Sequence, residues 1–365
     1  MIIPKNRSIA YYVSAHGYGH GVRSCDIVRA VGRLYPQIDV HIVSNLSPAF
    51  LSNQLGSSRI PVRASAFDVG MVQLDSIRVD VDATLDRVER LYAQRSELVA
   101  GEEAWLAEMG IDLAVVDIPA LPLEAAARLG IPALAVGNFA WDWIYSGFLG
   151  RDSRWNRIVD IFREEYARAD LLLRLPFSEP MSAFRHIEDI PLVASPGRPR
   201  REEISAIAGC DAGRKWVLLS FTTLDMSGEA LDEIEQLCGY EFFTVLPLEW
   251  RRKNIHPLDR EQVIFADVVA SVDAVISKPG FGILSNCVVN RKPLVYAERE
   301  DFLEYGILED AIRKYIRHVP IAAASLYRGD LRESLERLWE APEPPDTLPH
   351  GGDRIAARRI AEYPS

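Results

Sequence analysis

The sequence predicts a two-domain α/β protein in which each domain is built on a doubly wound parallel sheet. At 365 residues the chain exceeds the size at which a single hydrophobic core usually keeps growing. Short apolar, β-rich runs alternate with segments that carry apolar residues at helical spacing, as in βαβ units. This alternation pauses at 191–201, a stretch rich in proline, glycine and arginine, and then begins again.

The first half contains the elements of one open sheet. The segment 84–109 is amphipathic and charged on one face, so we expect a solvated outer helix with no chemistry of its own. The expected strands are 8–14, 39–43, 113–116 and 133–136, and the expected helices are 26–34, 48–55, 84–109 and 122–129.

The second half repeats this organisation after the linker. We expect an N-terminal Rossmann-like domain at 1–195, a second one at 196–350, and a C-terminal helix within 351–365 that packs back on the first domain. The expected strands of the second half are 216–221, 242–246, 263–265, 274–277 and 294–297, and the expected helices are 229–237, 282–289 and 353–362.

The composition narrows the classes of partner. Hydrophobic residues make up 48% and charged residues 25%, as in ordinary globular proteins, and the net charge of −11 disfavours nucleic acid and anionic lipid as partners. The first 21 residues lack the apolar core of a signal peptide, and no other stretch is apolar enough to span a bilayer. The four cysteines are scattered and lack metal-ligand spacing, which favours a reducing cytoplasm and argues against a zinc site. We therefore expect a cytoplasmic protein with no metal, and we expect no cofactor.

The segment after the first expected strand is the strongest candidate for a functional site. It contains His16 and His20 among the glycines Gly17, Gly19 and Gly21, and we expect it to form a loop between strand and helix. Ligands of open parallel sheets bind at the carboxyl ends of the strands, so two histidines at this position favour a functional role over a structural one. The glycine spacing differs from that of the dinucleotide-binding fingerprint.

Two further strand ends carry residues suited to chemistry. Asp117 follows the apolar run at 113–116, where it either polarises a histidine or caps the next helix. Ser277, Lys278, Gly280 and Gly282 lie between a strand and a helix, where backbone N–H groups and a lysine either bind a phosphate or form a simple turn.

Taken in order, these segments resemble the GT-B glycosyltransferases, and within them the nucleotide-sugar-binding domain at the front of plant-type L-arabinokinases and of related bacterial proteins. The resemblance covers nearly the whole chain. The stretches that carry it are YYVSAHGYGHGVRS (11–24), FDVGMVQLDSIRVD (67–80), VVDIPAL (115–121), VGNFAWDWIY (136–145), SKPGFGILSN (277–286) and RKPLVYAEREDFLEY (291–305).

The resemblance implies two such domains facing a central cleft and an inverting, metal-independent transfer. His20 would be the general base, and Asp117 would stabilise its protonated form. The donor-side residues that it implies are Ser220, Thr222, Thr223, Lys278, Gly280, Gly282, Asn286, Arg299 and Glu304, and the acceptor-side or cleft residues are His16, Gly19, Arg23, Asn138, Trp141 and Asp142. For Trp141 and Trp143, core packing and sugar stacking both remain open.

Two departures from the family pattern bear on the donor. Thr222 and Thr223 stand where related transferases usually have a glycine pair, and Asn286 stands where many have a glutamate that holds the ribose. The expected function is therefore transfer of a sugar from a nucleotide-sugar, favouring a UDP-sugar, to an unknown acceptor. The alternatives are a non-catalytic sugar-nucleotide-binding or regulatory module and a sugar-nucleotide epimerase or hydrolase.

Overall fold

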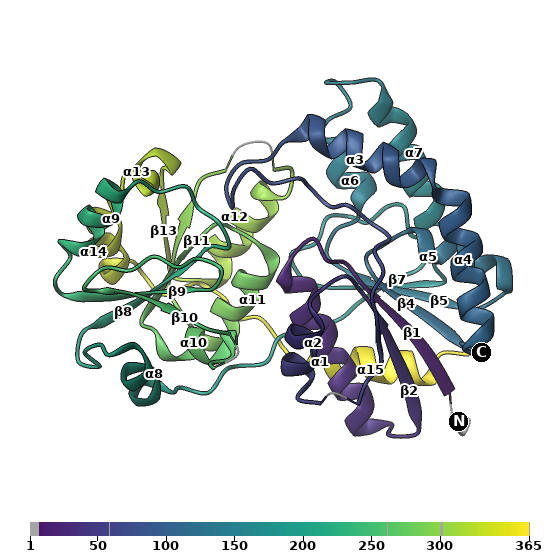
Figure 1. The fold of residues 1–365 in the computed structure, drawn as a ribbon, viewed down its shortest axis with the longest axis horizontal. Helices are drawn as coiled ribbons and strands as arrows, with labels where there is room; N and C mark the ends of the chain where they lie inside the picture. Colours follow the sequence, from purple (N-terminus) through teal and green to yellow (C-terminus); the bar gives the residue numbers. More distant parts are fainter. Residues whose placement is uncertain (1–6, 58, 261, 300–301, 365) are drawn as a thin grey trace. The chain divides into compact units, whose positions relative to one another are not determined.

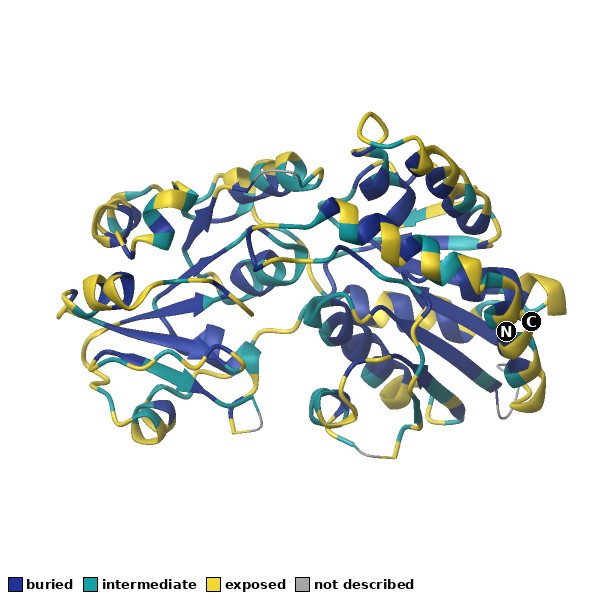
Figure 2. Cartoon of the chain, turned by 45° about the horizontal axis from the view of Figure 1, so that its top comes forward, coloured by how far each residue is buried: buried dark blue, intermediate teal, exposed yellow. Residues whose placement is uncertain are grey.

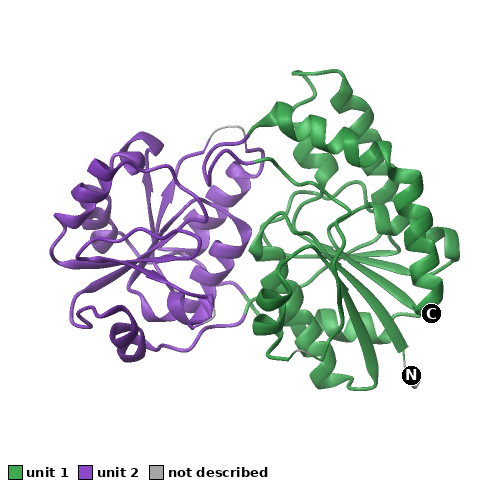
Figure 3. Ribbon diagram, viewed as in Figure 1, with its two compact units in different colours: residues 1–72, 80–194, 349–365 green, residues 73–79, 195–348 purple. Residues whose placement is uncertain are grey.

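The computed structural model describes residues 7–57, 59–260, 262–299 and 302–364; Glu300 and Asp301, within the last of the stretches quoted above, lie outside them. The chain divides into two compact units, coloured separately in Figure 3. Unit 1 comprises 1–72, 80–194 and 349–365, and unit 2 comprises 73–79 and 195–348. A seven-residue segment from the first half of the sequence thus belongs to unit 2.

Unit 1 is built on a seven-stranded parallel sheet in the order β3-β2-β1-β4-β5-β6-β7 (Figure 1). Its central strands are almost wholly buried, which explains why they read as continuous apolar runs. The strands are β1 (Arg7–Val13), β2 (Ile38–Val43), β3 (Val62–Arg63), β4 (Leu113–Asp117), β5 (Ala133–Gly137), β6 (Leu171–Arg174) and β7 (Ile187–Asp189).

Helices cover both faces of this sheet. One group is α1 (Tyr18–Leu34), α2 (Pro48–Leu55) and α15 (Gly352–Glu362); the other is α3 (Val81–Ala93), α4 (Arg95–Glu108), α5 (Leu121–Leu129), α6 (Trp141–Ser146) and α7 (Arg154–Tyr166). The single helix expected at 84–109 is wrong: α3 and α4 are separate helices that meet at Gln94, and they pack on different neighbours, α7 and α5.

The last helix of the chain is fastened to the first strand. Arg7, at the start of β1, donates from one guanidinium nitrogen to the carbonyl oxygens of Ile360, Ala361 and Tyr363 at the end of α15. These are carbonyls that a helix end leaves without partners, so a buried arginine satisfies them. Residues 349–365 thereby complete the core of unit 1, to which Ala356 and Ile360 contribute.

Unit 2 holds a six-stranded parallel sheet in the order β10-β9-β8-β11-β12-β13. Its strands are β8 (Lys215–Ser220), β9 (Tyr240–Val245), β10 (Ile255–Leu258), β11 (Ala274–Ser277), β12 (Leu294–Ala297) and β13 (His318–Ile321). Its helices are α8 (Arg201–Ala208), α9 (Gly228–Glu235), α10 (Phe265–Ser271), α11 (Phe281–Asn290), α12 (Tyr305–Tyr315), α13 (Ala323–Tyr327) and α14 (Arg332–Glu340).

One expected strand of unit 2 is wrong. The apolar run at 263–265 leads into α10, which begins at Phe265, and the edge strand of the sheet is β10 (Ile255–Leu258) instead. That strand contains His256 and Pro257, which interrupt the apolar run by which a strand is recognised in the sequence. Proline is tolerated there because one side of an edge strand forms no hydrogen bonds to another strand. In both units the central strands are buried while the outer helical faces are exposed (Figure 2).

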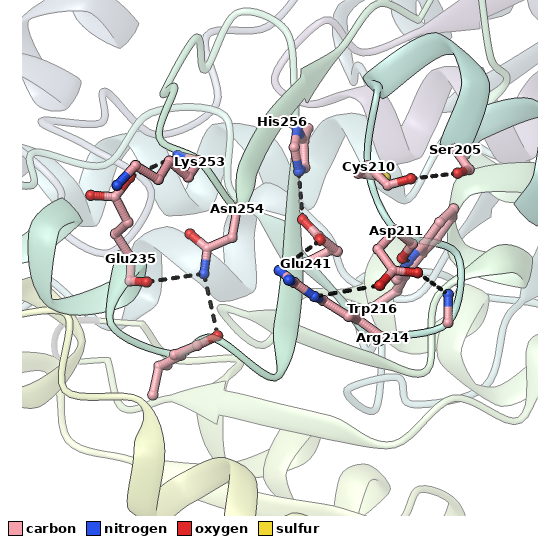
Figure 4. Close-up of polar contacts among 12 residues, drawn as sticks. Ser205, Cys210, Asp211, Arg214, Trp216, Glu235, Glu241, Lys253, Asn254 and His256 are labelled. Atoms are coloured by element: carbon pink, nitrogen blue, oxygen red, sulfur yellow. Dashed lines mark hydrogen bonds and ion pairs between the residues drawn. The ribbon is translucent and has the colours of Figure 1, made fainter.

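A partly buried polar cluster joins β9 and β10 near the amino-terminal ends of the strands (Figure 4). Glu241 lies 2.7 Å from Nε2 of His256 and 3.1 Å from a guanidinium nitrogen of Arg214. Because ligands of parallel sheets bind at the opposite, carboxyl ends, this pairing is a structural link between the strands.

Among the described residues, no helix combines the length and apolar character that crossing a membrane requires.

Candidate active site

The candidate site of unit 1 forms where its strand order reverses. The chain runs outward from β1 to β3 and returns to β4 on the other side of β1, so the loops after β1 and β4 diverge. In the sheet register Val13 pairs with Asp117, and the next residue, Ser14, donates its backbone N–H to the Asp117 carbonyl at 2.8 Å. Asn138 directly follows β5, the neighbouring strand. Topology alone thus brings these polar residues to one edge of the sheet.

The glycine-rich loop expected after the first strand is shorter than the sequence suggests. Helix α1 begins at Tyr18, with Gly17 as its N-cap residue, so Gly19, His20 and Gly21 lie in its first turn. Gly21 is required by packing, because a Cβ there would lie 2.6 Å and 2.7 Å from side-chain atoms of Phe50 and Leu46. A glycine that lets α2 approach α1 is indistinguishable, in sequence, from one that breaks a helix.

His20 points from the first turn of α1 to the end of β4. Its Nδ1 lies 2.8 Å from Oδ1 of Asp117, and its ring contacts Phe139 edge to face. The imidazole is 7% exposed and the aspartate is fully buried. If Nδ1 carries the proton that is shared with Asp117, Nε2 is the unprotonated nitrogen that can accept a proton from a ligand.

Arg23, one turn further along α1, shares the same carboxylate. Its Nε lies 2.7 Å from Oδ2 of Asp117 and its terminal nitrogen 2.5 Å from Oδ1, a bidentate pair. Ser24 donates to Oδ2 at 2.8 Å, and Arg23 also donates to Asn138. Burial alone would raise the pKa of Asp117, but the charge and hydrogen bonds of Arg23, with those of His20, hold that pKa well below its usual range.

Two further residues lie beside this group: His16, which was predicted, and Asp68, which was not. His16 accepts the backbone N–H of Met71 at Nδ1, 3.1 Å away, and stacks edge to face on Trp141. The indole of Trp141 is 1% exposed and donates to Asp68 at 2.9 Å, so this ring packs in the core of unit 1. Asp68 lies in the quoted stretch 67–80, but no pattern in the sequence separates it from neighbouring acidic residues.

Asp142 is buried in the first turn of α6 with little compensation. Its Oδ1 has no hydrogen-bond partner among the described residues, and its Oδ2 lies 3.7 Å from Nε of Arg163. Burial raises the pKa of Asp142 to about 6, against the opposing attraction of Arg163. Trp143, the other ring of this segment, is partly exposed.

In unit 2 the strand order reverses between β8 and β11, and the candidate donor residues gather there. Ser277, the last residue of β11, donates to the Ser220 carbonyl at the end of β8, 2.8 Å away. Gly280 is the N-cap residue of α11, and a Cβ on it would meet no protein atom. The first N–H groups of a helix have no partner within the helix, so a helix start beside open space suits an anion.

Two cations lie at this end of the sheet. Burial and the nearby Arg299 lower the pKa of Lys278 to about 7, opposed by Glu304 and Asp75. Arg299 has a side chain that is 3% exposed; it donates to the Pro279 carbonyl, lies 4.0 Å from Glu304, and covers the ring of Phe302. Within the part of the chain that the structure describes, its Nε and a second terminal nitrogen have no hydrogen-bond partner.

Other predicted donor residues are already engaged within unit 2. The hydroxyl of Ser76 accepts the backbone N–H groups of Thr222 and Thr223 at 3.1 Å and 3.2 Å, while the Ser76 N–H donates to the Thr223 carbonyl. Beside it, Asp75 accepts hydrogen bonds from the Tyr327 hydroxyl and the Arg78 guanidinium. The side-chain amide of Asn286 donates to the Gly282 carbonyl inside α11.

The chain was compared with family models, curated proteins and solved structures. No protein-family model matches the chain. A curated relative, the L-arabinokinase of Arabidopsis thaliana, is 31% identical over 345 residues; the match covers 91% of this chain but only 32% of that protein, so the chain spans about a third of its relative.

Solved structures show the same fold over nearly the whole chain. Phytolacca americana UGT2, complexed with UDP-2fluoro-glucose and pterostilbene, has a TM-score of 0.61 at 11% identity, covering 98% of this chain and 94% of that one. Arabidopsis thaliana UGT89C1, complexed with quercetin, has 0.60 at 13% identity (97% and 93%), and the calicheamicin glycosyltransferase CalG4 has 0.59 at 16% identity (98% and 94%). The fold is that of the GT-B glycosyltransferases, an α/β fold with two Rossmann-like parts.

Proposed function

We propose that the protein is an inverting glycosyltransferase that moves a sugar from a nucleotide-sugar to an acceptor hydroxyl. The observation that carries the proposal is the contact between His20 Nδ1 and Asp117 Oδ1, 2.8 Å, at the end of β4. A histidine oriented by a buried carboxylate keeps its other nitrogen available as a general base near neutral pH.

In this reaction Nε2 of His20 takes the proton of the acceptor hydroxyl while the oxygen of that hydroxyl attacks the anomeric carbon of the donor sugar. The bond between that carbon and the diphosphate oxygen breaks, and the nucleoside diphosphate leaves. Asp117 stabilises the imidazolium. Lys278 and Arg299 would neutralise the departing diphosphate, and two guanidinium nitrogens of Arg299 have no partner among the described residues.

The donor is most consistent with a UDP-sugar. Two of the solved structures that share the fold are described as complexes with UDP or UDP-2fluoro-glucose. Because Ser76 occupies the amides of Thr222 and Thr223, the proposal places the phosphates at Lys278, Arg299 and the start of α11. Metal-independent chemistry and a cytoplasmic location belong to the same proposal.

A second candidate is a sugar-nucleotide-binding module without catalysis. Two observations favour it. Arg23 competes with His20 for the Asp117 carboxylate, and Ser76 occupies the amides of Thr222 and Thr223, which stand where related transferases usually have a glycine pair. The match to one third of an L-arabinokinase is compatible with either role.

The experiment combines donor titration with product analysis. Calorimetric titration with UDP, dTDP, GDP and their glucose conjugates identifies the donor, and mass spectrometry then detects sugar added to members of an acceptor panel. The proposal expects selective binding and an acceptor of increased mass. Selective binding with no product from any acceptor would support the binding module, whereas free sugar or an epimer formed without an acceptor would identify a hydrolase or epimerase.

A further inference from the structure

The loop at 67–71 places a carboxylate beside His20 in unit 1. Asp68 accepts the indole N–H of Trp141 at 2.9 Å. Trp141 is buried, whereas Asp68 itself is partly exposed. The ring of Trp141 contacts the ring of Phe139, which in turn contacts the ring of His20. Burial raises the pKa of Asp68, and attraction to His20 opposes that shift.

The position of Asp68 is fixed by the backbone that follows it. Gly70 has a φ of +69°, and a Cβ there would lie 2.1 Å from Nδ1 of His16. The hydroxyl of Tyr145 donates to the Gly70 carbonyl at 3.0 Å, and the N–H of Met71 donates to His16. A side chain held on both sides is preorganised and loses little entropy when it binds a ligand.

The hydrogen bonds within the protein do not use the whole carboxylate. An ionised carboxylate accepts about four hydrogen bonds, and among the described residues Trp141 supplies one. A purely structural role, satisfying the indole, would be met equally by a fully buried acceptor. Asp68 instead keeps accessible acceptor capacity on the side chain that is next to the proposed base.

We propose that Asp68 binds a second hydroxyl of the acceptor, which makes the acceptor a polyol such as a monosaccharide. This inference rests on the proposed function and names its acceptor class. One hydroxyl gives its proton to Nε2 of His20 and forms the new bond to the anomeric carbon, while a neighbouring hydroxyl donates to Asp68. The carboxylate takes no proton in the step, so Asp68 is a positioning residue.

The test measures binding and turnover for hydroxylic probes. Glucose, galactose, xylose and myo-inositol are compared with cyclohexanol, which has one hydroxyl, in the wild type and in Asp68→Asn and Asp68→Ala. The asparagine variant keeps an acceptor for the indole of Trp141 and so preserves the fold. Asp189→Asn, at an exposed ion pair of unit 1, is the matched control.

The proposal predicts that at least one polyol binds the wild type, with saturation-transfer NMR as the binding readout. Asp68→Ala should weaken that binding about tenfold or more, the effect expected for losing a hydrogen bond to a charged group. In turnover the loss should appear in the acceptor KM, with the donor KM and the cyclohexanol reaction unchanged.

Binding of no polyol, or equal losses for polyol and cyclohexanol, would overturn the proposal. So would tighter Asp68-dependent binding of cyclohexylamine than of every polyol, because that would assign the carboxylate to an ammonium group. Asp68-dependent polyol binding without any sugar transfer would instead remove the proposed transferase activity while leaving a polyol site, so the two failures are distinguishable.

Discussion

At the residue scale, the central feature of unit 1 is one carboxylate with several partners. Asp117 is fully buried and is held by His20, by Ser24 and by the bidentate guanidinium of Arg23. Spacing in the sequence can suggest the aspartate at a strand end, but Arg23 becomes a partner only because α1 begins early enough to place it one turn after His20. Its pairing with Asp117 is therefore a feature that only the structure reveals.

Asp117→Asn should destabilise the protein because it leaves Arg23 buried without its counter-charge. Breaking a buried ion pair on one side typically costs about 3 kcal/mol or more. The matched variant Asp189→Asn breaks a bidentate pair with Arg174 in which the aspartate is 73% exposed, and should cost about 1 kcal/mol or less. Urea denaturation of both variants checks this, and equal losses would contradict the central position of Asp117.

Lys278 should make the binding of UDP depend on pH. Burial lowers the pKa of Lys278 to about 7 in the free protein, and an anion favours the protonated amine. Affinity should therefore be greatest below about pH 7 and fall above it, by up to about tenfold per pH unit, until the raised pKa of the complex is reached. Lys278→Arg, which stays charged, should flatten the profile measured by calorimetry between pH 7 and 9.

The corresponding effect on folding has a defined sign. The folded-state pKa of Lys278 lies below its unfolded value of 10.5, so its burial costs stability at and below neutral pH. That cost diminishes as pH rises from about 7 towards 10.5.

For the binding prediction, a pH-independent Kd for UDP in the wild type would show that Lys278 does not contact the phosphates.

At the scale of elements, the first turn of α1 determines the site. The predicted loop and the observed helical turn differ because three glycines in eight residues normally signal a break, and here Gly21 serves helix packing instead. The split of the predicted helix at 84–109 has a similar origin, since α3 and α4 turn towards different partners. Both differences come from tertiary contacts that local periodicity does not encode.

Two glycines of α1 allow a matched test of this interpretation. Gly21→Ala should destabilise by about 1–3 kcal/mol, because its Cβ would overlap Phe50 and Leu46 of the segment that includes α2. Gly32→Ala, in the same helix and with nothing within 4 Å of the new Cβ, should stabilise by about 0.5–1 kcal/mol. If chemical denaturation finds Gly21→Ala stabilising as well, close packing at Gly21 is not required.

At the scale of the whole molecule, the sequence is sufficient to predict the fold class. The buried strands β4, β5, β11 and β12 appear as apolar runs within a residue of their observed bounds. It does not predict that 73–79 belongs to unit 2, because the bonds of Ser76 to Thr222 and Thr223 and of Asp75 to Tyr327 join residues more than 140 positions apart. For the same reason it cannot show that the Thr222 and Thr223 amides are already occupied.

The most direct test of the proposed chemistry is the rate at which His20→Ala releases nucleoside diphosphate in the presence of donor and acceptor. The account predicts a fall in kcat of about 100-fold or more, with the Kd of the donor unchanged within about threefold. His256→Gln, which alters the partly buried histidine–glutamate pair of unit 2, should leave kcat within about twofold of the wild type. Turnover retained by His20→Ala would contradict the assignment of His20 as the general base.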